Sequence, residues 1–89
     1  MYYLNDMLLA ARRNLELARA KPEIFGRYAV NYAWKGLKLE EELEAALAAW
    51  PSTQRQMLAR ELHVRKLEFL QILSEAEHLG IPTNPEISV

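Results

Sequence analysis

The stretch that decides the fold is residues 22–50, PEIFGRYAVNYAWKGLKLEEELEAALAAW. Apolar and small residues recur in it at alternating spacings of four and three, the period of one packed face of an α-helix. This face comprises Phe25, Ala29, Tyr32, Gly36, Leu39, Leu43, Ala46 and Trp50. The phase does not change at Gly36, and no Ser, Thr, Asp or Asn lies between Gly36 and Glu40 to cap a new helix. The sequence therefore predicts one helix from Pro22 to Trp50, with Gly36 on its packed face.

A shorter helix is predicted before this one, from about Tyr3 to Ala20. Its apolar residues again fall on one face, and they are Leu4, Leu8, Ala11, Leu15 and Ala18. Pro22 ends it, because proline disfavours helical geometry at the preceding residue and suits the first turn of a new helix.

A third helix is predicted after the connection Pro51-Ser52-Thr53. Thr53 and Gln56 have the spacing of a capping box, in which two side chains satisfy free backbone N–H groups at a helix start. Gly80 is expected to end the helix in a left-handed conformation, with Ile81 folded back on the last turn.

The composition also favours helices, since 49 of the 89 residues are Ala, Glu, Lys, Leu or Arg. We expect an all-α fold in which a short N-terminal helix precedes a long antiparallel, coiled-coil-like hairpin, with dimerisation completing the bundle. Residues 1–80 would form one helical domain. Residues 81–89 would form an extended or disordered tail.

The charged residues have an internal explanation if the hairpin turns at Pro51 and Ser52, because position i then lies near position 103 − i. This register sets opposite charges against each other, as flanking charges do in coiled coils. The expected groups are Glu40, Glu41, Glu42 and Glu44 against Arg60, Arg65 and Lys66; Lys35 against Glu68; and Arg27 against Glu75 and Glu77.

Arg65 is the unusual residue of the third helix, because it falls in the middle of the apolar stripe. An unpaired buried guanidinium would cost several kcal/mol. We expect its stem to pack while its head reaches Glu40 or Glu61. The alternative is a carboxylate supplied across an interface.

Several functional classes lack support in the sequence. The net charge is −1 and there is no cysteine, so neither a basic nucleic-acid footprint nor a thiolate metal site is indicated. No run approaches the ~20 apolar residues that span a bilayer, and no secretory signal is evident, so we expect a cytoplasmic protein without a membrane partner.

Candidate catalytic and metal residues are sparse. Glu75 and His78 have a Glu-x-x-His spacing found in di-metal bundles, but such a site needs a second copy of the motif. His63 lacks a nucleophile to activate, and no glycine-rich phosphate-binding loop is present. We therefore expect no enzymatic activity, no cofactor and no metal.

A second apolar stripe lies away from the main helix faces and predicts a partner interface. Because one hairpin and one short helix cannot cover all of it, we expect self-association through it. Its residues are Val30, Trp34, Leu37, Met57, Val64 and Leu67. The predicted function is a non-enzymatic interaction protein, namely an adaptor, regulator or assembly subunit that forms a homo-oligomer and binds a protein partner.

Two alternatives remain. One is a di-metal carboxylate bundle. The other is a nucleic-acid-associated helical module, which the compensated charges do not favour; it would use Arg12, Arg13, Arg19, Lys21, Arg55 and Arg60.

Overall fold

A computed structural model describes residues 2–20 and 26–84 of the chain. These residues form three α-helices, α1 (Tyr2–Arg19), α3 (Arg27–Ala45) and α4 (Ser52–His78), and one short 3₁₀ helix, η1 (Leu47–Ala49). No strand occurs among them. The all-helical prediction is confirmed for this part of the chain.

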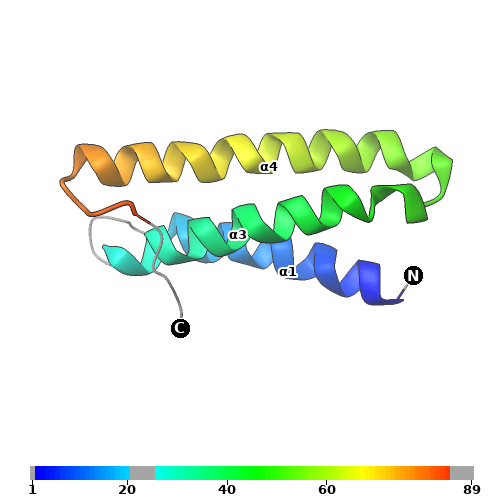
Figure 1. Ribbon diagram of the computed structural model, residues 1–89, viewed down its shortest axis with the longest axis horizontal. Helices are drawn as coiled ribbons and strands as arrows, with labels where there is room; N and C mark the ends of the chain where they lie inside the picture. The colour runs from blue at the N-terminus through cyan, green and yellow to red at the C-terminus, as the bar shows by residue number, and fades with distance from the viewer. Residues whose placement is uncertain (1, 21–25, 85–89) are drawn as a thin grey trace.

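The three helices lie side by side, with α3 packed against both of the others (Figure 1). The chain reverses after η1, and α4 runs back along α3. Since α1 also runs opposite to α3, the first and last helices point the same way, and they contact each other less than either contacts α3. The molecule measures 43 × 27 × 17 Å.

The middle helix is continuous through Gly36, as predicted, but within the described residues it is shorter than predicted. Gly26 precedes the first helical residue with φ 54° and ψ −115°, outside the helical region. At the other end, α3 stops at Ala45 and the chain tightens into η1. Trp50 is extended, with φ −82° and ψ 151°, because the following proline disfavours helical geometry there. The predicted start at Pro22 lies outside the described residues.

The predicted capping box at the start of α4 is wrong. The helix begins at Ser52, so Thr53 already lies inside its first turn, and no side chain caps the end. The carbonyl of Pro51 instead accepts the backbone N–H groups of Gln54 and Arg55, at 2.9 and 3.1 Å.

The predicted stop at Gly80 is confirmed. Gly80 has φ 77°, which a side chain would disfavour. The backbone N–H groups of Gly80 and Ile81 donate to the carbonyls of Glu77 and Ala76, both at 3.0 Å. These are the two hydrogen bonds of a Schellman cap.

The apolar core has two separate parts. One lies near the turn between α3 and α4 and contains Leu8, Ala11, Leu43, Trp50 and Leu62. The other lies toward the opposite end and contains Leu15, Ala18, Val30, Ala33, Phe69, Ile72, Leu73 and Ala76.

The ring of Phe69 lies directly over Gly36. A Cβ atom at position 36 would come closer than 3.0 Å to the Cζ, Cε1 and Cε2 atoms of that ring. Glycine is therefore required at this point of the helix for α4 to approach α3, despite its low helix propensity.

Candidate functional site

A buried layer of charged side chains separates the two apolar parts of the core. Glu40 of α3 is 0% exposed and Arg65 of α4 is 3% exposed. The Nε of Arg65 donates to Oε1 of Glu40, and its Nη2 donates to Oε2 at 3.1 Å. The pair forms a bidentate ion pair, which is a strong arrangement between a guanidinium and a carboxylate.

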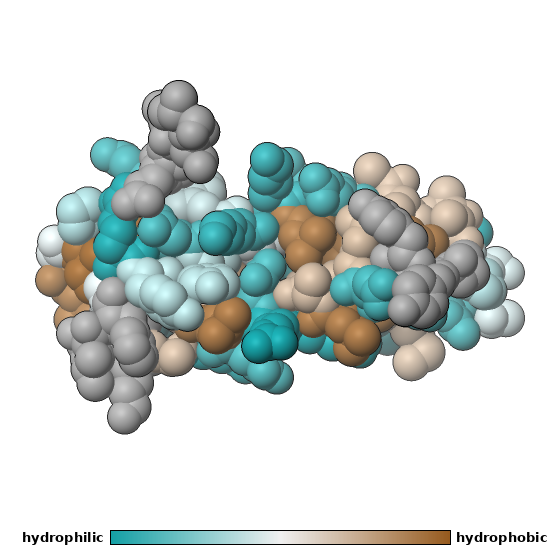
Figure 2. Space-filling view, turned by 90° about the horizontal axis from the view of Figure 1, so that it is seen from below, coloured by the Kyte–Doolittle hydropathy of each residue, from teal (hydrophilic) through white to brown (hydrophobic). Residues whose placement is uncertain are grey.

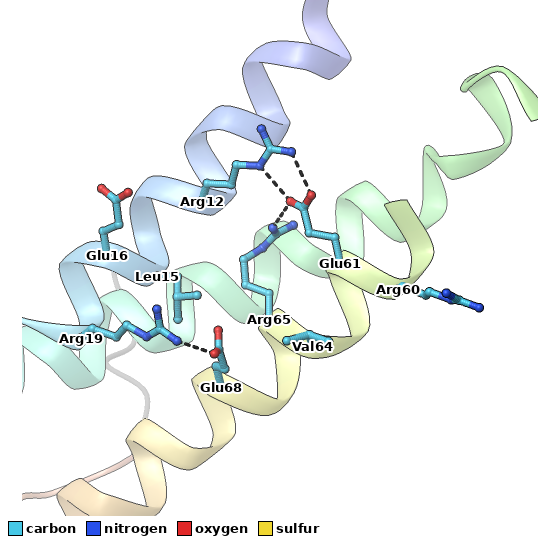
Figure 3. Close-up of a pocket in the computed structure, with 9 residues that line it drawn as sticks. All are labelled: Arg12, Leu15, Glu16, Arg19, Arg60, Glu61, Val64, Arg65 and Glu68. Carbon is cyan, nitrogen blue, oxygen red and sulfur yellow. Dashed lines mark hydrogen bonds and ion pairs between the residues drawn. The ribbon is translucent and has the colours of Figure 1, made fainter. Parts of the chain in front are cut away.

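Glu61 extends this layer to the first helix (Figure 3). Its carboxylate accepts a hydrogen bond from Nη1 of Arg65. It also accepts two from Arg12 of α1, from Nε at 2.9 Å and from Nη2 at 2.8 Å. The ion-pair network of Glu40, Arg65, Glu61 and Arg12 therefore links all three α-helices. It contains two acidic and two basic side chains.

The environment of the layer shifts the pKa values of its members. Hydrogen bonds from Arg12 lower the pKa of Glu61 to about 2, with Arg65 adding to the effect and burial opposing it. Burial raises the pKa of Glu40, and the hydrogen bonds from Arg65 work against that rise. Burial acts to lower the pKa of Arg65, but its bonds to Glu40 and Glu61 outweigh this and raise it. Glu61 and Arg65 are therefore charged at neutral pH.

For Arg65, the predicted partners are confirmed, since it contacts both Glu40 and Glu61. Its head is more buried than expected, because it bonds inside the core instead of reaching the surface. Polar groups at such a position fix one register in some helical assemblies, since any slip leaves a buried charge unpaired. The same reasoning applies to this layer.

The link from α1 to α4 was not anticipated from the sequence, although a signal for it exists. Arg12 and Arg19 are seven residues apart, as are Glu61 and Glu68, and seven residues are close to two helical turns. In the structure Arg12 pairs with Glu61, and Arg19 pairs with Glu68. The two equal spacings match because α1 and α4 run in the same direction.

A groove of about 530 Å³ lies between α1 and α4, and the residues of both ion pairs line it. Leu15 and Val64 contribute its apolar lining, and its other lining residues are charged. Figure 3 shows Arg60 directed away from the other lining residues, without an ion-pair contact to any of them.

The other expected charge pairs are found in part. Lys66 pairs with Glu44 at 3.0 Å. The predicted contact between Lys35 and Glu68 is wrong, because Glu68 is bound by Arg19 and the Lys35 ammonium lies 5.1 Å from the centre of the Tyr32 ring.

The predicted partner stripe divides into two halves in the structure. Val30 is completely buried, so it is removed from any exposed interface. Trp34 and Leu37 are partly buried and pack against the second part of the core. The indole N–H of Trp34 donates to the carbonyl of Thr83 at 2.8 Å, so the end of the described chain occupies the surface that was predicted to receive a partner.

Residues 81–84 are held on α3 mainly through backbone atoms. Arg27 donates to the carbonyl oxygens of Pro82 and Asn84, at 2.8 and 2.7 Å. The side chain of Ile81 packs against the apolar core. This stretch of the predicted tail therefore belongs to the folded unit.

The α4 half of the stripe is exposed to solvent. The exposed fractions are 74% for Met57, 54% for Val64 and 53% for Leu67, and the nearby Leu70, which was not among the predicted residues, is 51% exposed. We call the exposed stripe that contains Met57, Val64 and Leu67 the outer face of α4. It is exposed along its length, has spacings of three and four, and comprises Met57, Arg60, Val64, Leu67, Gln71 and Ser74. It lies opposite the buried face that contains Arg65 and Phe69.

The opposite side of the molecule has a different surface. In Figure 2, which views the structure from the side away from α4, the hydrophobic areas are small and separated by hydrophilic ones. Leu9 of α1 is 60% exposed but is followed by Arg12 and Arg13 on the same helix. Leu9 is therefore an exposed leucine outside the outer face of α4, and a substitution there can serve as a control for substitutions on that face.

The residues proposed for other functions lie apart from one another or have internal contacts. Arg55 donates to the carbonyls of Ala48 and Trp50, at 3.2 and 3.0 Å, so like Arg12 and Arg19 it makes contacts within the chain. Lys21 lies outside the described residues. Glu75, His78 and His63 are all exposed on α4, and no cluster of three potential metal ligands occurs within residues 2–20 and 26–84.

Comparison with protein families, curated proteins and solved structures found no match. Among the helices in the described ranges, none is long and apolar enough to cross a membrane.

Proposed function

We propose that the protein is a non-enzymatic helical interaction protein that self-associates through the outer face of α4 and serves as an adaptor, regulator or assembly subunit. The observation that supports this proposal is the exposure of Met57, Val64 and Leu67 at helical spacing on one face. Several exposed apolar side chains on one helix face of a small protein favour an interaction surface.

The buried charges support a structural role for the rest of the molecule. Within the described residues, no buried side-chain nitrogen or oxygen lacks a hydrogen-bond partner. The charged side chains of the layer thus make their hydrogen bonds to one another, between α1, α3 and α4. The apolar side chains on the outer face of α4, by contrast, are exposed to solvent.

A second copy of the chain is the occupant favoured for this face. The net charge of −1 produces little repulsion between copies. Closed homodimers are also the commonest assemblies of soluble oligomers. One helix face offers a small interface, so we expect a weak dimer with a dissociation constant of about 10 µM.

The nucleic-acid alternative is less favoured because three of its five arginines are engaged within the chain. Arg12 and Arg19 each pair with a carboxylate of α4, and Arg55 binds two backbone carbonyls. A guanidinium that is already paired adds little to an electrostatic footprint for phosphates.

Sedimentation velocity over a range of protein concentrations tests the proposal. The wild-type chain should shift from monomer to dimer as its concentration rises. Val64→Glu should weaken this association at least tenfold, because it places a charge in the centre of the interface. Leu9→Glu makes the same change at an exposed leucine of α1 and should leave association unchanged.

Circular dichroism of both variants would verify that the helices remain folded. A wild-type chain that stays monomeric at several hundred micromolar would contradict the proposal. Equal weakening by the two substitutions would also contradict it, because association would then not depend on the outer face of α4.

A further inference from the structure

The outer face of α4 carries opposite charges toward its two ends. Arg60 lies toward the start of the helix, and among the described residues it has no ion-pair partner. Glu75 lies toward the other end, one position from Ser74 of the outer face, and is exposed. Within the described residues, the carboxylate of Glu75 accepts one side-chain hydrogen bond, a long one from Gln71 at 3.5 Å.

The apolar residues of this face define a register for self-pairing. Val64 and Leu67 are the central apolar pair, three residues apart. If two copies of α4 pack antiparallel with Val64 of each copy opposite Leu67 of the other, position i faces position 131 − i. Both apolar contacts then form at once about a two-fold axis, as a closed dimer requires. The flanking contacts in this register join Met57 to Ser74 and Arg60 to Gln71.

The same register brings Arg60 of one copy close to Glu75 of the other. Arg60 faces position 71 of the second copy, one helical turn from Glu75. A long arginine side chain can reach across one turn while its stem remains on apolar surface. The two-fold axis repeats the contact, so one dimer contains two such pairs. A parallel arrangement would instead place Arg60 beside Arg60 and Glu75 beside Glu75, which is unfavourable.

We propose that the occupant of the outer face is α4 of a second copy, packed antiparallel with Val64 opposite Leu67, and that Arg60 pairs with Glu75 of the second copy. This inference rests on the proposed self-association and adds its orientation and register. Val64 and Arg60 also border the groove between α1 and α4, so the second helix would lie along the α4 rim of that groove.

Charge reversal tests the pairing. We expect Arg60→Glu and Glu75→Arg each to weaken dimerisation about tenfold in sedimentation velocity at low salt, since each introduces two like-charge contacts per dimer. The double variant should restore association to within about threefold of the wild-type value, because it exchanges the two charges and keeps the pair. Matched controls are Arg13→Glu on α1 and Glu77→Arg, which lies on α4 away from the outer face; both should leave association unchanged.

The outcomes separate the two proposals. Recovery in the double variant supports the antiparallel register. If the wild-type chain dimerises and Val64→Glu disrupts it, but the double variant is no stronger than the single ones, the register is overturned while self-association through α4 stands. A monomeric wild-type chain overturns both.

Discussion

Replacing Gly36 with alanine should destabilise the protein, although alanine is the better helix former. In the middle of an exposed helix the change would stabilise by about 1 kcal/mol. Here the new Cβ would lie closer than 3.0 Å to three ring atoms of Phe69, and that ring is 0% exposed. The ring must retreat by roughly 1 Å to restore ordinary contact, and overpacking of this kind costs about 1–3 kcal/mol or more.

The expected net loss for Gly36→Ala is therefore about 1–2 kcal/mol. For a chain of this size, it corresponds to a fall in melting temperature of roughly 5–15 °C. Urea unfolding followed by circular dichroism would measure the loss. Because the proposed association would also stabilise the folded state, all variants must be compared at one protein concentration.

A second substitution isolates the clash from other effects. Phe69→Leu removes the aromatic ring atoms that meet the new Cβ, at a cost of its own in lost packing. In that background Gly36→Ala should be neutral or stabilising by up to about 1 kcal/mol, so the two changes should be strongly non-additive. The close approach of α3 and α4 would be refuted if Gly36→Ala raised stability equally in both backgrounds.

Three further predictions concern the charged layer and the end of the chain. The pKa of Glu61 is about 2 in the folded protein and 4.5 as a free carboxyl, so its pairing stabilises the fold above about pH 5 and this contribution is lost as the pH falls toward 2. Because Glu61 is partly exposed, Glu61→Gln should lower the free energy of unfolding by only about 1–2 kcal/mol at pH 7. Urea unfolding should show that the difference from wild type shrinks in acid. A difference that does not change with pH would argue against this contribution of Glu61. Trp34→Phe removes the hydrogen bond to the Thr83 carbonyl, so amide exchange near residue 83 should accelerate while the centre of α4 is unaffected, and unchanged exchange at the chain end would contradict this contact. Gly80→Ala forces a side chain into φ 77° and should lower stability by about 1 kcal/mol in thermal unfolding, whereas a gain in stability would show that the helix does not end in this left-handed turn.

The periodic features of the sequence predicted the fold best. The unbroken alternation of apolar residues identified α3 as continuous through Gly36, and the sequence at Gly80 predicted the end of α4. The ends of α3 were predicted poorly where the structure describes them, because local backbone geometry differs there from a regular α-helix. Gly26 has a positive φ just before the first helical residue, and the chain tightens into η1 after Ala45 although the apolar pattern continues to Trp50.

The contacts of the candidate site depended on how distant segments pack. The pairing of Arg65 with Glu40 followed from folding one helix back on the other. The bond from Arg12 to Glu61 required the direction of α1 relative to α4, which no connection between those two helices fixes. Trp34 donates to the backbone carbonyl of Thr83, and Arg27 donates to those of Pro82 and Asn84; a pattern of side chains carries no signal for such backbone contacts.

The central claim is that two copies of the chain associate through α4, and a distance between the copies tests it most directly. The chain has no cysteine, so Ser74→Cys would carry one spin label per copy on the outer face. In the antiparallel register, the two labelled positions lie roughly 17 residues apart along the helix axis, and pulsed electron resonance should report about 25–30 Å between them. A distance near 10 Å would contradict the antiparallel arrangement, and the absence of any coupling at concentrations of several hundred micromolar would contradict self-association itself.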